Sequence, residues 1–347
     1  MATGTPLRVM IVEDSTVVRM LLTHLIESDP RLTVARAVSS AEEALAVLNQ
    51  VRPDVISMDI NLPGMDGLEA TRRIMAERPT PIVVVSGSVE RQALHSSMDA
   101  LSAGALSVVE KPVGVRHDDY AQVAREITTQ LVIMSEVPVI RRRMRTPAIA
   151  PRAAVRTGSI ANKAAMVVMA ASTGGPQALA RLLREVPATF PLPILLVQHM
   201  GAAFMAGFAA WLDGVVPLCV RLAETGMRPV AGEVIVAPGG RHLEVGEGGV
   251  LRLSDGPAIK GQRPSATVLF SAAAAALGAN VLGVVLTGMG DDGALGVERL
   301  VAAGATVFAE DESTAVVHGM SAAAAAAGAQ AMPLDAIAGA MLRLATR

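Results

Sequence analysis

Aromatic residues are scarce in this sequence: they make up 2% of its 347 residues, with one Trp and one Tyr. Nucleic-acid binding by base stacking depends on aromatic side chains, so the composition argues against it. The net charge of −2 also provides no general attraction to phosphate backbones. The single cysteine, Cys219, excludes internal disulfides and suits a reducing cytoplasm. We therefore expect a cytoplasmic protein that does not bind nucleic acid.

Signals for export and membrane insertion are also missing. The N-terminus lacks the cationic region and the long apolar core that a secretory signal would have. Residues 271–290 carry no charge and could pass for a membrane span, but they change from an alanine-rich stretch to the strand-like VLGVVLTG. We predict a buried helix that runs into a buried strand, in a chain that is not membrane-inserted.

Hydrophobic residues, by contrast, are abundant at 51%, and the length of the chain suggests two domains. The first, residues 6–130, alternates apolar strand patterns with amphipathic helix patterns. Its strands are predicted at residues 8–13, 32–38, 54–59, 81–86 and 107–112. Five such units indicate a doubly wound α/β domain, in which helices cover both faces of a parallel sheet.

The alternation stops over residues 131–162, which are rich in Pro and Arg and have no sustained period. We interpret this segment as a linker between the domains. Its arginine run around residue 143 could dock on an acidic partner, although a solvated flexible segment is the simpler interpretation.

Strand and helix patterns resume in residues 163–347. Strands are predicted at residues 165–172, 193–199, 218–224, 233–239, 280–288 and 305–309. A hairpin is predicted in HLEVGEGGVLRLSDG, with Gly248 and Gly249 in its turn. The second domain is therefore expected to be another doubly wound α/β sheet, with an antiparallel hairpin added to it.

Charged and hydroxyl side chains follow four of the predicted strands in the first domain. Glu13 and Asp14 end the first strand, Asp59 the third, Ser86 the fourth and Lys111 the fifth. Ligands of open parallel sheets bind at this edge, where these side chains should converge. Three carboxylates repel one another and require a cation or raised pKa values, and Mg²⁺ suits such oxygen ligands. Capping carboxylates would explain any one of these residues, but not five in register.

The motifs IVEDS, MDINLPGMDGLEA, VVVSGS and EKP closely resemble the receiver domain of bacterial response regulators, which has a flavodoxin-like five-stranded fold. The resemblance implies a phosphoacceptor, Asp59; three magnesium ligands, Glu13, Asp14 and Asp59; and two phosphoryl contacts, Ser86 and Lys111. It also implies a histidine kinase as phosphodonor. Receivers usually carry an aromatic switch residue three positions before the lysine, where this chain has Val108, so an aromatic rotamer switch is not expected.

In the second domain, AASTGGPQAL places Ser172 between an apolar strand and the start of a helix, whose first turn suits Pro176. A serine on such a turn faces backbone N–H groups and the positive end of the helix. The pattern Ala170-x-Ser172-x-Gly174 is close to the small-x-Ser-x-Gly nucleophile elbow. On this stretch alone, a serine that caps the helix is an equally good interpretation.

A nucleophilic serine needs a base. Of the six histidines, His199 ends the buried strand PILLVQH at the edge where the strand of Ser172 also ends. His242 and His318 lie nearer turns and are weaker candidates. The histidines show no paired spacing such as HExxH, which argues against a metal site.

The base in turn needs an orienting carboxylate. The segment VLGVVLTGMGDDGALG offers Asp291 and Asp292 after a buried strand, and spacing alone does not choose between them. Its glycines let backbone N–H groups approach a substrate oxygen closely.

Together AASTGGP, VQHM, VIVAPGGRHL, QRPSATVLF and LTGMGDDGA strongly resemble the catalytic domain of chemotaxis methylesterases. With the receiver in front, the resemblance extends to the family of chemotaxis response-regulator protein-glutamate methylesterases. It implies a nucleophile, Ser172; a general base, His199; an orienting acid, Asp292; and an oxyanion donor, the backbone N–H of Met289. It further implies hydrolysis of glutamyl methyl esters on methyl-accepting chemoreceptors, with receptor glutamine deamidation as a second activity and no cofactor for the esterase reaction.

The chain departs from the family pattern at three places. The family usually has two prolines after the Met that follows the histidine, whereas this chain has HMGAAF. Its HRPS is QRPS here, and its FGMP is HGMS. None of these changes removes a member of the triad, and the first two affect the substrate rim.

Two other functions are compatible with parts of the sequence. A phosphorylation-controlled binding module would need to have lost catalysis, which the intact Ser, His and Asp argue against. A receiver-linked transcription factor would need a helix-turn-helix or a basic face after the linker, and neither is visible. We therefore expect an esterase whose unphosphorylated receiver covers the approach to Ser172, with the rim at residues 201–203 as the docking surface.

Overall fold

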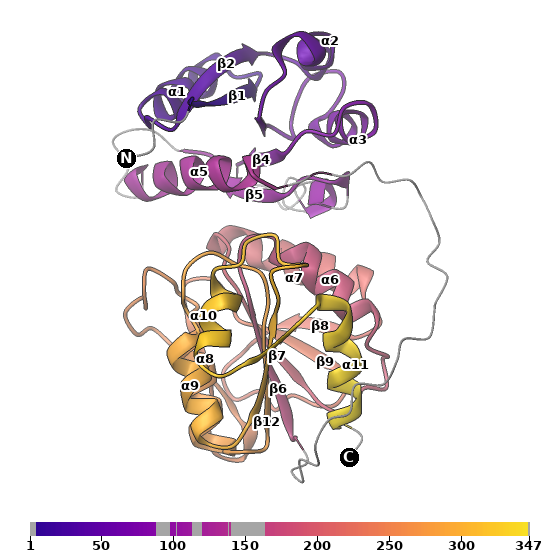
Figure 1. Ribbon diagram of the computed structural model, residues 1–347, viewed down its shortest axis with the longest axis vertical. Coiled ribbons are helices and arrows are strands. Elements are labelled where there is room, and N and C mark those ends of the chain that lie inside the picture. Colours follow the sequence, from indigo (N-terminus) through magenta and orange to yellow (C-terminus); the bar gives the residue numbers. More distant parts are fainter. Residues whose placement is uncertain are drawn as a thin grey trace.

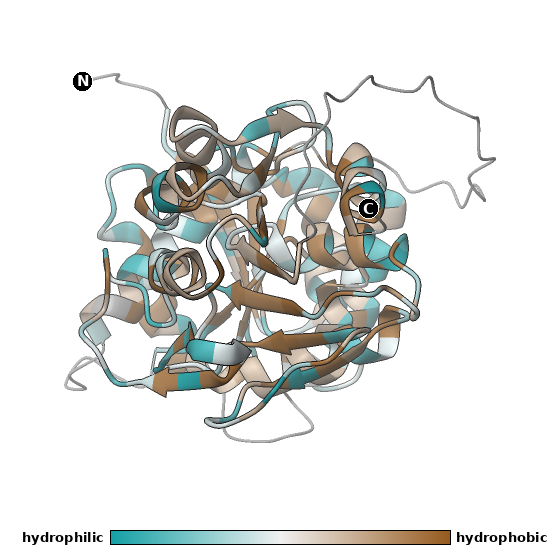
Figure 2. Cartoon of the chain, turned by 90° about the horizontal axis from the view of Figure 1, so that it is seen from below, coloured by the Kyte–Doolittle hydropathy of each residue, from teal (hydrophilic) through white to brown (hydrophobic). Residues whose placement is uncertain are grey.

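The chain forms two α/β domains, one above the other in Figure 1, in a computed structural model. The structure describes residues 5–87, 98–101, 103–112, 120–137, 139 and 164–345. Coloured by hydropathy, the strands are mostly hydrophobic, and polar residues gather on the helices and loops around them (Figure 2). None of the helices in the described ranges is long and apolar enough to cross a membrane.

The N-terminal domain has a five-stranded parallel sheet of order β2-β1-β3-β4-β5, as predicted. Its strands are β1 (Leu7–Val12), β2 (Leu32–Val38), β3 (Val55–Met58), β4 (Ile82–Ser86) and β5 (Ser107–Glu110). Its helices are α1 (Thr16–Glu27), α2 (Ala41–Val51), α3 (Gly67–Glu77) and α5 (Tyr120–Ser135). Buried residues of α2 and α3 pack on one face of the sheet and those of α1 and α5 on the other.

Helices of this domain begin where a polar side chain caps the first turn. Ser15, Ser40 and Asp66 each accept a hydrogen bond from the backbone N–H three residues later. The caps of α1 and α2 follow closely on the ends of β1 and β2, so the helices start next to the carboxyl edge of the sheet. That edge is where the acidic residues lie.

The predicted domain boundary at residue 130 is too early. Helix α5 continues to Ser135, because Leu131 and Met134 are fully buried against the sheet and extend its apolar face. The rest of the predicted linker, apart from residues 136, 137 and 139, lies outside the described residues.

The C-terminal domain has a seven-stranded parallel sheet of order β14-β13-β12-β6-β7-β9-β8. Its strands are β6 (Met166–Ala171), β7 (Ile194–Gln198), β8 (Cys219–Leu222), β9 (Glu233–Val236), β12 (Val281–Val285), β13 (Thr306–Glu310) and β14 (Gln330–Met332). Six of these lie at the predicted positions. The edge strand β14 was not predicted, because three residues are too few to show an alternating pattern.

Helices cover both faces of this sheet. They are α6 (Gly175–Arg184), α7 (Met205–Val215), α8 (Ala266–Leu277), α9 (Ala294–Ala302), α10 (Met320–Ala326) and α11 (Leu334–Ala345), with short 3₁₀ turns at Ala202–Phe204 and Glu247–Gly249. Helices α6, α7 and α11 pack on one face, and α8, α9 and α10 on the other (Figure 1). The uncharged stretch 271–290 is the end of α8 followed by β12, as predicted.

The predicted antiparallel hairpin is β10 (His242–Val245) paired with β11 (Leu251–Ser254). Gly248 and Gly249 in its turn have φ values of +66° and +75°. Residues with a Cβ rarely adopt this region, so the glycines allow the tight reversal.

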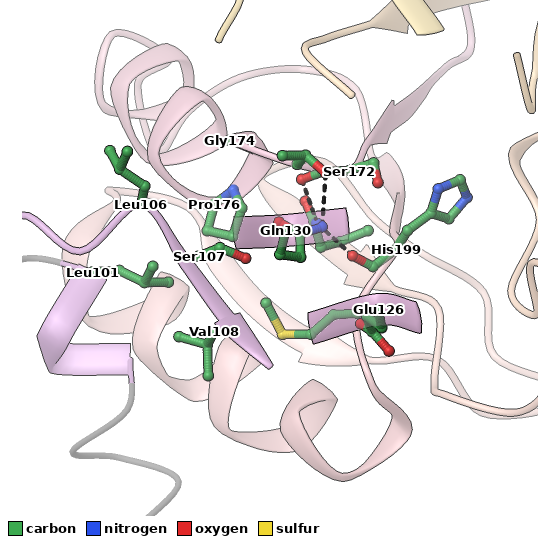
Figure 3. Close-up of a pocket in the computed structure, with 13 residues that line it drawn as sticks. Leu101, Leu106, Ser107, Val108, Glu126, Gln130, Ser172, Gly174, Pro176 and His199 are labelled. Atoms are coloured by element: carbon green, nitrogen blue, oxygen red, sulfur yellow. Dashed lines mark hydrogen bonds between the residues drawn. The ribbon is translucent and has the colours of Figure 1, made fainter. Parts of the chain in front are cut away.

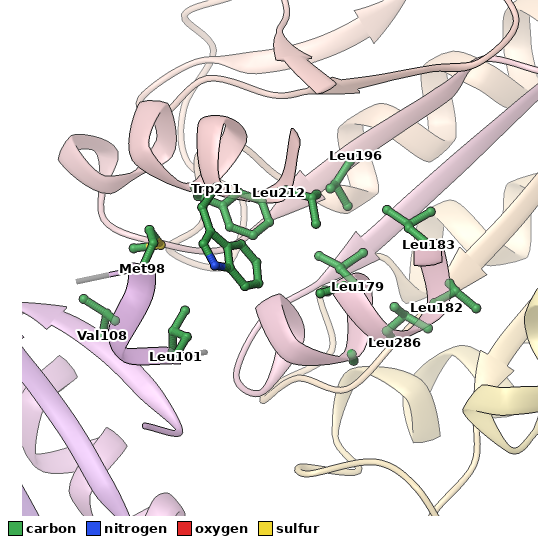
Figure 4. Close-up of a cluster of buried hydrophobic side chains, with 14 of the residues drawn as sticks. Met98, Leu101, Val108, Leu179, Leu182, Leu183, Leu196, Trp211, Leu212 and Leu286 are labelled. Carbon is green, nitrogen blue, oxygen red and sulfur yellow. The ribbon is translucent and has the colours of Figure 1, made fainter. Parts of the chain in front are cut away.

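The receiver-like domain turns β5 and α5 toward the C-terminal domain (Figure 1). Met98 and Leu101 belong to the same buried apolar cluster as Trp211 of α7 and Leu179 of α6 (Figure 4). The hydrophobic cores of the two domains are therefore continuous across their interface.

Candidate functional site

Ser172 lies on the turn between β6 and α6. The helix cap is Gly174, with φ +77° and no side-chain hydrogen bond, so Ser172 does not cap this helix. The backbone holds the serine from both neighbouring strands: its N–H donates to Thr287 O at 3.0 Å, and its carbonyl accepts from Gln198 Nε2 at 2.9 Å. The Ser172 hydroxyl makes no hydrogen bond among the described residues and is left for other chemistry.

The sheet order explains why residues distant in sequence surround this serine. Strands β12, β6 and β7 are neighbours, and their carboxyl ends carry Thr287, Ser172 and His199 side by side. Ser172 and His199 line one cavity, as the parallel edge predicts (Figure 3).

His199 is paired with Asp292. Its Nε2 lies 2.9 Å from Asp292 Oδ2, and both side chains are 5% exposed or less. Its other ring nitrogen, Nδ1, is buried and has no hydrogen-bond partner among the described residues. A neutral His199 that donates Nε2–H to Asp292 therefore has its lone pair on Nδ1, available to a substrate or nucleophile. The nitrogens have the opposite assignment in the serine-protease triad, where the acid holds Nδ1.

The carboxylate of Asp292 is buried, and both of its oxygens take part in hydrogen bonds. Oδ1 accepts from Ser265 Oγ at 2.7 Å and from Thr267 N–H at 3.2 Å, and Oδ2 also accepts from Ala266 N–H at 2.7 Å. These backbone donors are the N-terminus of α8. Burial by itself would raise the pKa of Asp292, but the hydrogen bonds from His199, Ser265 and Thr267 lower it to about 2. The carboxylate is charged at neutral pH.

Asp291 occupies a different environment. It is 54% exposed and pairs with Lys260 on the surface. The tertiary structure thus distinguishes the two aspartates that spacing left equivalent, and it brings only Asp292 to His199.

Met289 lies on the loop after β12 and is 51% exposed. Its backbone N–H has no hydrogen-bond partner among the described residues. The preceding Gly288 packs closely on the serine: a Cβ there would come within 2.8 Å of Ser172 Cβ. The loop that carries Met289 therefore passes next to the serine.

None of the other histidines in the described residues pairs with Asp292. His242 is buried, with Nδ1 accepting from Ser265 N–H and Nε2 near Pro257 O, so it supports the Ser265 turn. His318 forms a bridge with Gly288, and His24 lies in α1. His95 and His117 lie outside the described residues.

The cavity of Ser172 is shared with the N-terminal domain. Glu126, Gln130 and Val108 line it from α5 and β5 (Figure 3). Gln130 Nε2 donates to Thr173 Oγ1 at 3.1 Å, next to the serine. Burial and the nearby Glu110 raise the pKa of Glu126. At the rim, a Cβ on Gly201 would lie 3.8 Å from Glu110 Oε2, so this predicted docking position lies near the N-terminal domain.

Sequence reasoning missed Ser265, Gln198 and Gln130 in this site. Ser265 showed one signal, because Pro264-Ser265 before an alanine-rich helix is typical of a helix start, and Ser265 is the N-cap residue of α8. Gln198 and Gln130 showed none, since their hydrogen bonds join residues 26 and 43 positions apart.

The predicted acidic group of the N-terminal domain is also assembled. Glu13, Asp14 and Asp59 each place a carboxylate oxygen within 4.8 Å of the others. Lys111 Nζ lies 2.8 Å from Asp59 Oδ2 and 2.9 Å from Glu13 Oε2. Ser86 is fully buried, and its hydroxyl has no hydrogen-bond partner in the part of the chain that the structure describes.

The charges of this group affect one another. Burial and the neighbouring Asp59 raise the pKa of Glu13. Burial by itself would lower the pKa of Lys111, but hydrogen bonds and attraction from Asp59 and Glu13 raise it. Three converging carboxylates with one ammonium leave net negative charge, which fits a divalent cation.

Comparisons with known proteins identify both domains. Residues 167–341 match the CheB methylesterase family, and residues 9–118 match the response regulator receiver domain family. The chain is 50% identical to a protein-glutamate methylesterase/protein-glutamine glutaminase of Paramagnetospirillum magneticum, over 98% of this chain and 97% of that protein. A Myxococcus xanthus protein described in the same words is 45% identical over 91% and 90% of the two chains.

A solved structure supports the C-terminal fold. The CheB methylesterase catalytic domain of Thermotoga maritima is 34% identical and matches with a TM-score of 0.50, covering 53% of this chain and all of that one. The chain therefore belongs to the CheB methylesterase family and carries a response regulator receiver domain in front of its methylesterase domain.

Proposed function

We propose that this chain is a phosphorylation-regulated protein-glutamate methylesterase that acts on methyl-accepting chemoreceptors and also deamidates receptor glutamines. The observation that carries the proposal is the buried His199–Asp292 pair beside Ser172, at the carboxyl edge of the sheet. The relatives at 50% and 45% identity are named for both activities, which supports the choice of substrate.

The first half of the reaction forms an acyl-enzyme. Ser172 Oγ attacks the carbonyl carbon of the methyl ester, and His199 Nδ1 takes the hydroxyl proton while Nε2–H stays hydrogen-bonded to Asp292. The negative charge on Asp292 stabilises the imidazolium that forms. The free N–H of Met289 donates to the developing oxyanion, and one such donor is worth ~3–4 kcal/mol in comparable sites.

The second half releases the products. Protonated His199 returns its proton to the leaving methoxide, which departs as methanol. The same nitrogen then takes a proton from water, whose oxygen attacks the acyl carbon, and the collapse of this intermediate restores Ser172 and frees a glutamate. With a glutamine substrate, the leaving group is ammonia and the residues keep their roles.

In the receiver domain we assign Asp59 as the phosphoacceptor. Glu13, Asp14 and Asp59 would hold Mg²⁺, since their carboxylate oxygens converge. When bound, Mg²⁺ supplies positive charge that offsets the phosphoryl oxygens. Lys111, next to Asp59, and the buried hydroxyl of Ser86 are suited to contact the phosphoryl group. A histidine kinase of the same pathway is the proposed phosphodonor.

Regulation follows from the arrangement of the domains. We propose that the docked receiver blocks the approach of a receptor to Ser172, and that phosphorylation of Asp59 weakens the docking. The shared cavity and the Gln130–Thr173 hydrogen bond support this assignment. Phosphate-induced movement would reach the interface through β5. This strand carries Val108, which lines the shared cavity, and it ends next to Lys111.

Replacing the nucleophile tests the proposal. Ser172→Ala is expected to reduce methanol release from methylated receptor membranes by ~10³-fold or more, with unchanged phosphorylation of Asp59. Ser313→Ala, an exposed serine of the same domain, is the matched control and should keep full activity. Near-normal methanol release by folded Ser172→Ala protein would exclude the serine mechanism, and an inactive wild-type protein would favour a binding module.

A further inference from the structure

Glu310 is a buried carboxylate that the proposed mechanism does not use. It is the last residue of β13, is 1% exposed, and has no ion pair with a described cation. Burial raises its pKa, and the hydrogen bond from the Thr287 backbone opposes that effect. Burying an ionisable group costs folding free energy, which indicates that Glu310 has a role beyond packing.

Glu310 acts on the strand next to the nucleophile. Its Oε2 accepts a hydrogen bond from Thr287 N–H at 2.8 Å. Strands β13, β12 and β6 are neighbours, so Thr287 stands between Glu310 on one side and Ser172 on the other. His199 approaches Ser172 from the opposite side, on β7.

Thr287 contacts the turn of the nucleophile in two ways. Its carbonyl accepts the N–H of Ser172 at 3.0 Å, and its Oγ1 donates to the carbonyl of Thr173 at 2.9 Å. Oγ1 also accepts from Val317 N–H at 2.9 Å. The Thr287–Gly288 peptide and the Thr287 side chain therefore fix the backbone on both sides of the Ser172 Cα–C bond.

The same peptide also leads into the loop that carries Met289. Gly288 follows Thr287, and its own N–H and carbonyl are held by Val317 O at 3.0 Å and Met320 N–H at 2.8 Å. Met289, with the free N–H, comes next. A rotation of the Thr287 peptide would move the donor and the nucleophile together.

We propose that Glu310 is a positioning residue for the esterase reaction: through Thr287 it sets the distance between the Ser172 hydroxyl and the Met289 N–H. A carboxylate makes a stronger bond to a backbone N–H than a neutral acceptor does. This inference rests on the proposed function, because it takes Ser172 and Met289 as the groups being positioned. A small displacement of a nucleophile can lower the reaction rate strongly, since about 1 Å can cost 10²-fold in rate.

Glu310→Ala and Glu310→Gln in the full-length chain test the proposal, with methanol release measured in the presence of a small-molecule phosphodonor to remove the effect of docking. Glu310→Ala is expected to lower kcat by ~10- to 100-fold with little change in KM. Glu310→Gln should recover most of kcat, because its carbonyl oxygen can accept the same N–H.

A matched control separates positioning from stability. Val307→Ala removes a buried side chain of the same strand that does not reach Thr287, and it should lower Tm without lowering kcat. Normal kcat in folded Glu310→Ala, equal losses in the Gln and Ala variants, or an equal loss in Val307→Ala would each overturn the proposal.

Two further measurements keep the outcome clear. If Glu310→Ala does not fold, Thr287→Val is compared with Thr287→Ser, since only the serine keeps the hydroxyl bond to Thr173 O. An unaffected kcat in Thr287→Val would then contradict the positioning role. If wild-type protein is active and Ser172→Ala is not, a normal Glu310→Ala refutes this inference alone; if wild-type protein is inactive, the proposed function itself fails.

Discussion

Two glutamines join the receiver to the active-site elements, and removing them should release the enzyme without phosphorylation. Gln130 Nε2 of α5 donates to Thr173 Oγ1 at 3.1 Å. Gln177 Nε2 of α6 donates to Ala105 O at 2.6 Å, with Leu101 O at 3.4 Å as a second, longer contact. The perturbation is the pair of substitutions Gln130→Ala and Gln177→Ala.

The size of the effect follows from these contacts. A neutral hydrogen bond contributes about 0.5–1.5 kcal/mol net, so two of them contribute about 1–3 kcal/mol to docking. A coupling free energy of 1–3 kcal/mol corresponds to roughly 5- to 150-fold in an equilibrium. Apolar contacts such as Leu101 with the cluster of Trp211 remain in the variant, so docking weakens rather than disappears (Figure 4).

The assay is the initial rate of methanol release from methylated receptor membranes, with and without a phosphodonor. Each single substitution should raise the unphosphorylated rate about 2- to 10-fold, and the double substitution should multiply the two effects, since the contacts are separate. The phosphorylated rate should stay the same, so the stimulation ratio shrinks.

A control glutamine is available on the far side of the receiver. Gln50 of α2 is exposed and lies in a helix on the side of the receiver away from the methylesterase domain (Figure 1). Gln50→Ala should leave both rates unchanged. An unchanged unphosphorylated rate in the double variant would refute the docking argument. A parallel rise in both rates would instead indicate an effect on catalysis.

The remaining predictions concern charged groups. Asp292→Asn should lower kcat by roughly 10⁴-fold and Asp291→Asn by less than about threefold, because only Asp292 can hold the His199 tautomer; equal losses in methanol release would show the assignment to be wrong. The pKa of Asp292 falls from 3.8 to about 2 on folding, so its charge stabilises the protein above pH 3.8 and this stability disappears as pH drops toward 2. Urea unfolding should therefore find Asp292→Asn about 2 kcal/mol less stable at pH 6 but closer to wild type at pH 3, and a constant difference would contradict this. Because the pKa of Glu13 is raised, protons should compete with Mg²⁺ as pH falls toward that raised pKa, and Glu13→Gln should weaken binding and flatten this pH dependence in a titration.

Local patterns in the sequence determine most of the architecture. Apolar runs of strand length alternate with helix patterns, and this alternation predicts parallel sheets in both halves without any knowledge of contacts. The edge rule for parallel strands then predicts that Glu13, Asp59 and Lys111 meet, and the structure brings them together. The fold, and the sheet edge at which the candidate site residues lie, therefore follow from local patterns.

Burial decided what local patterns left open. Asp291 and Asp292 are adjacent and chemically identical, and only packing against the N-terminus of α8 makes one a buried partner of His199 and leaves the other on the surface. The end of α5 was set in the same way, because Leu131 and Met134 find an apolar face to cover.

Contacts between distant segments belong wholly to the tertiary structure. Gln130 meets Thr173 only because the two domains pack together, and Glu310 reaches Thr287 only because β13 pairs with β12. A glutamine and a glutamate carry no periodic signal, and their partners are set by how the strands are ordered in space. The sequence by itself therefore determined the elements and their chemistry, whereas tertiary packing determined which groups act on each other, since hydrogen bonds depend on distances that the linear order does not contain.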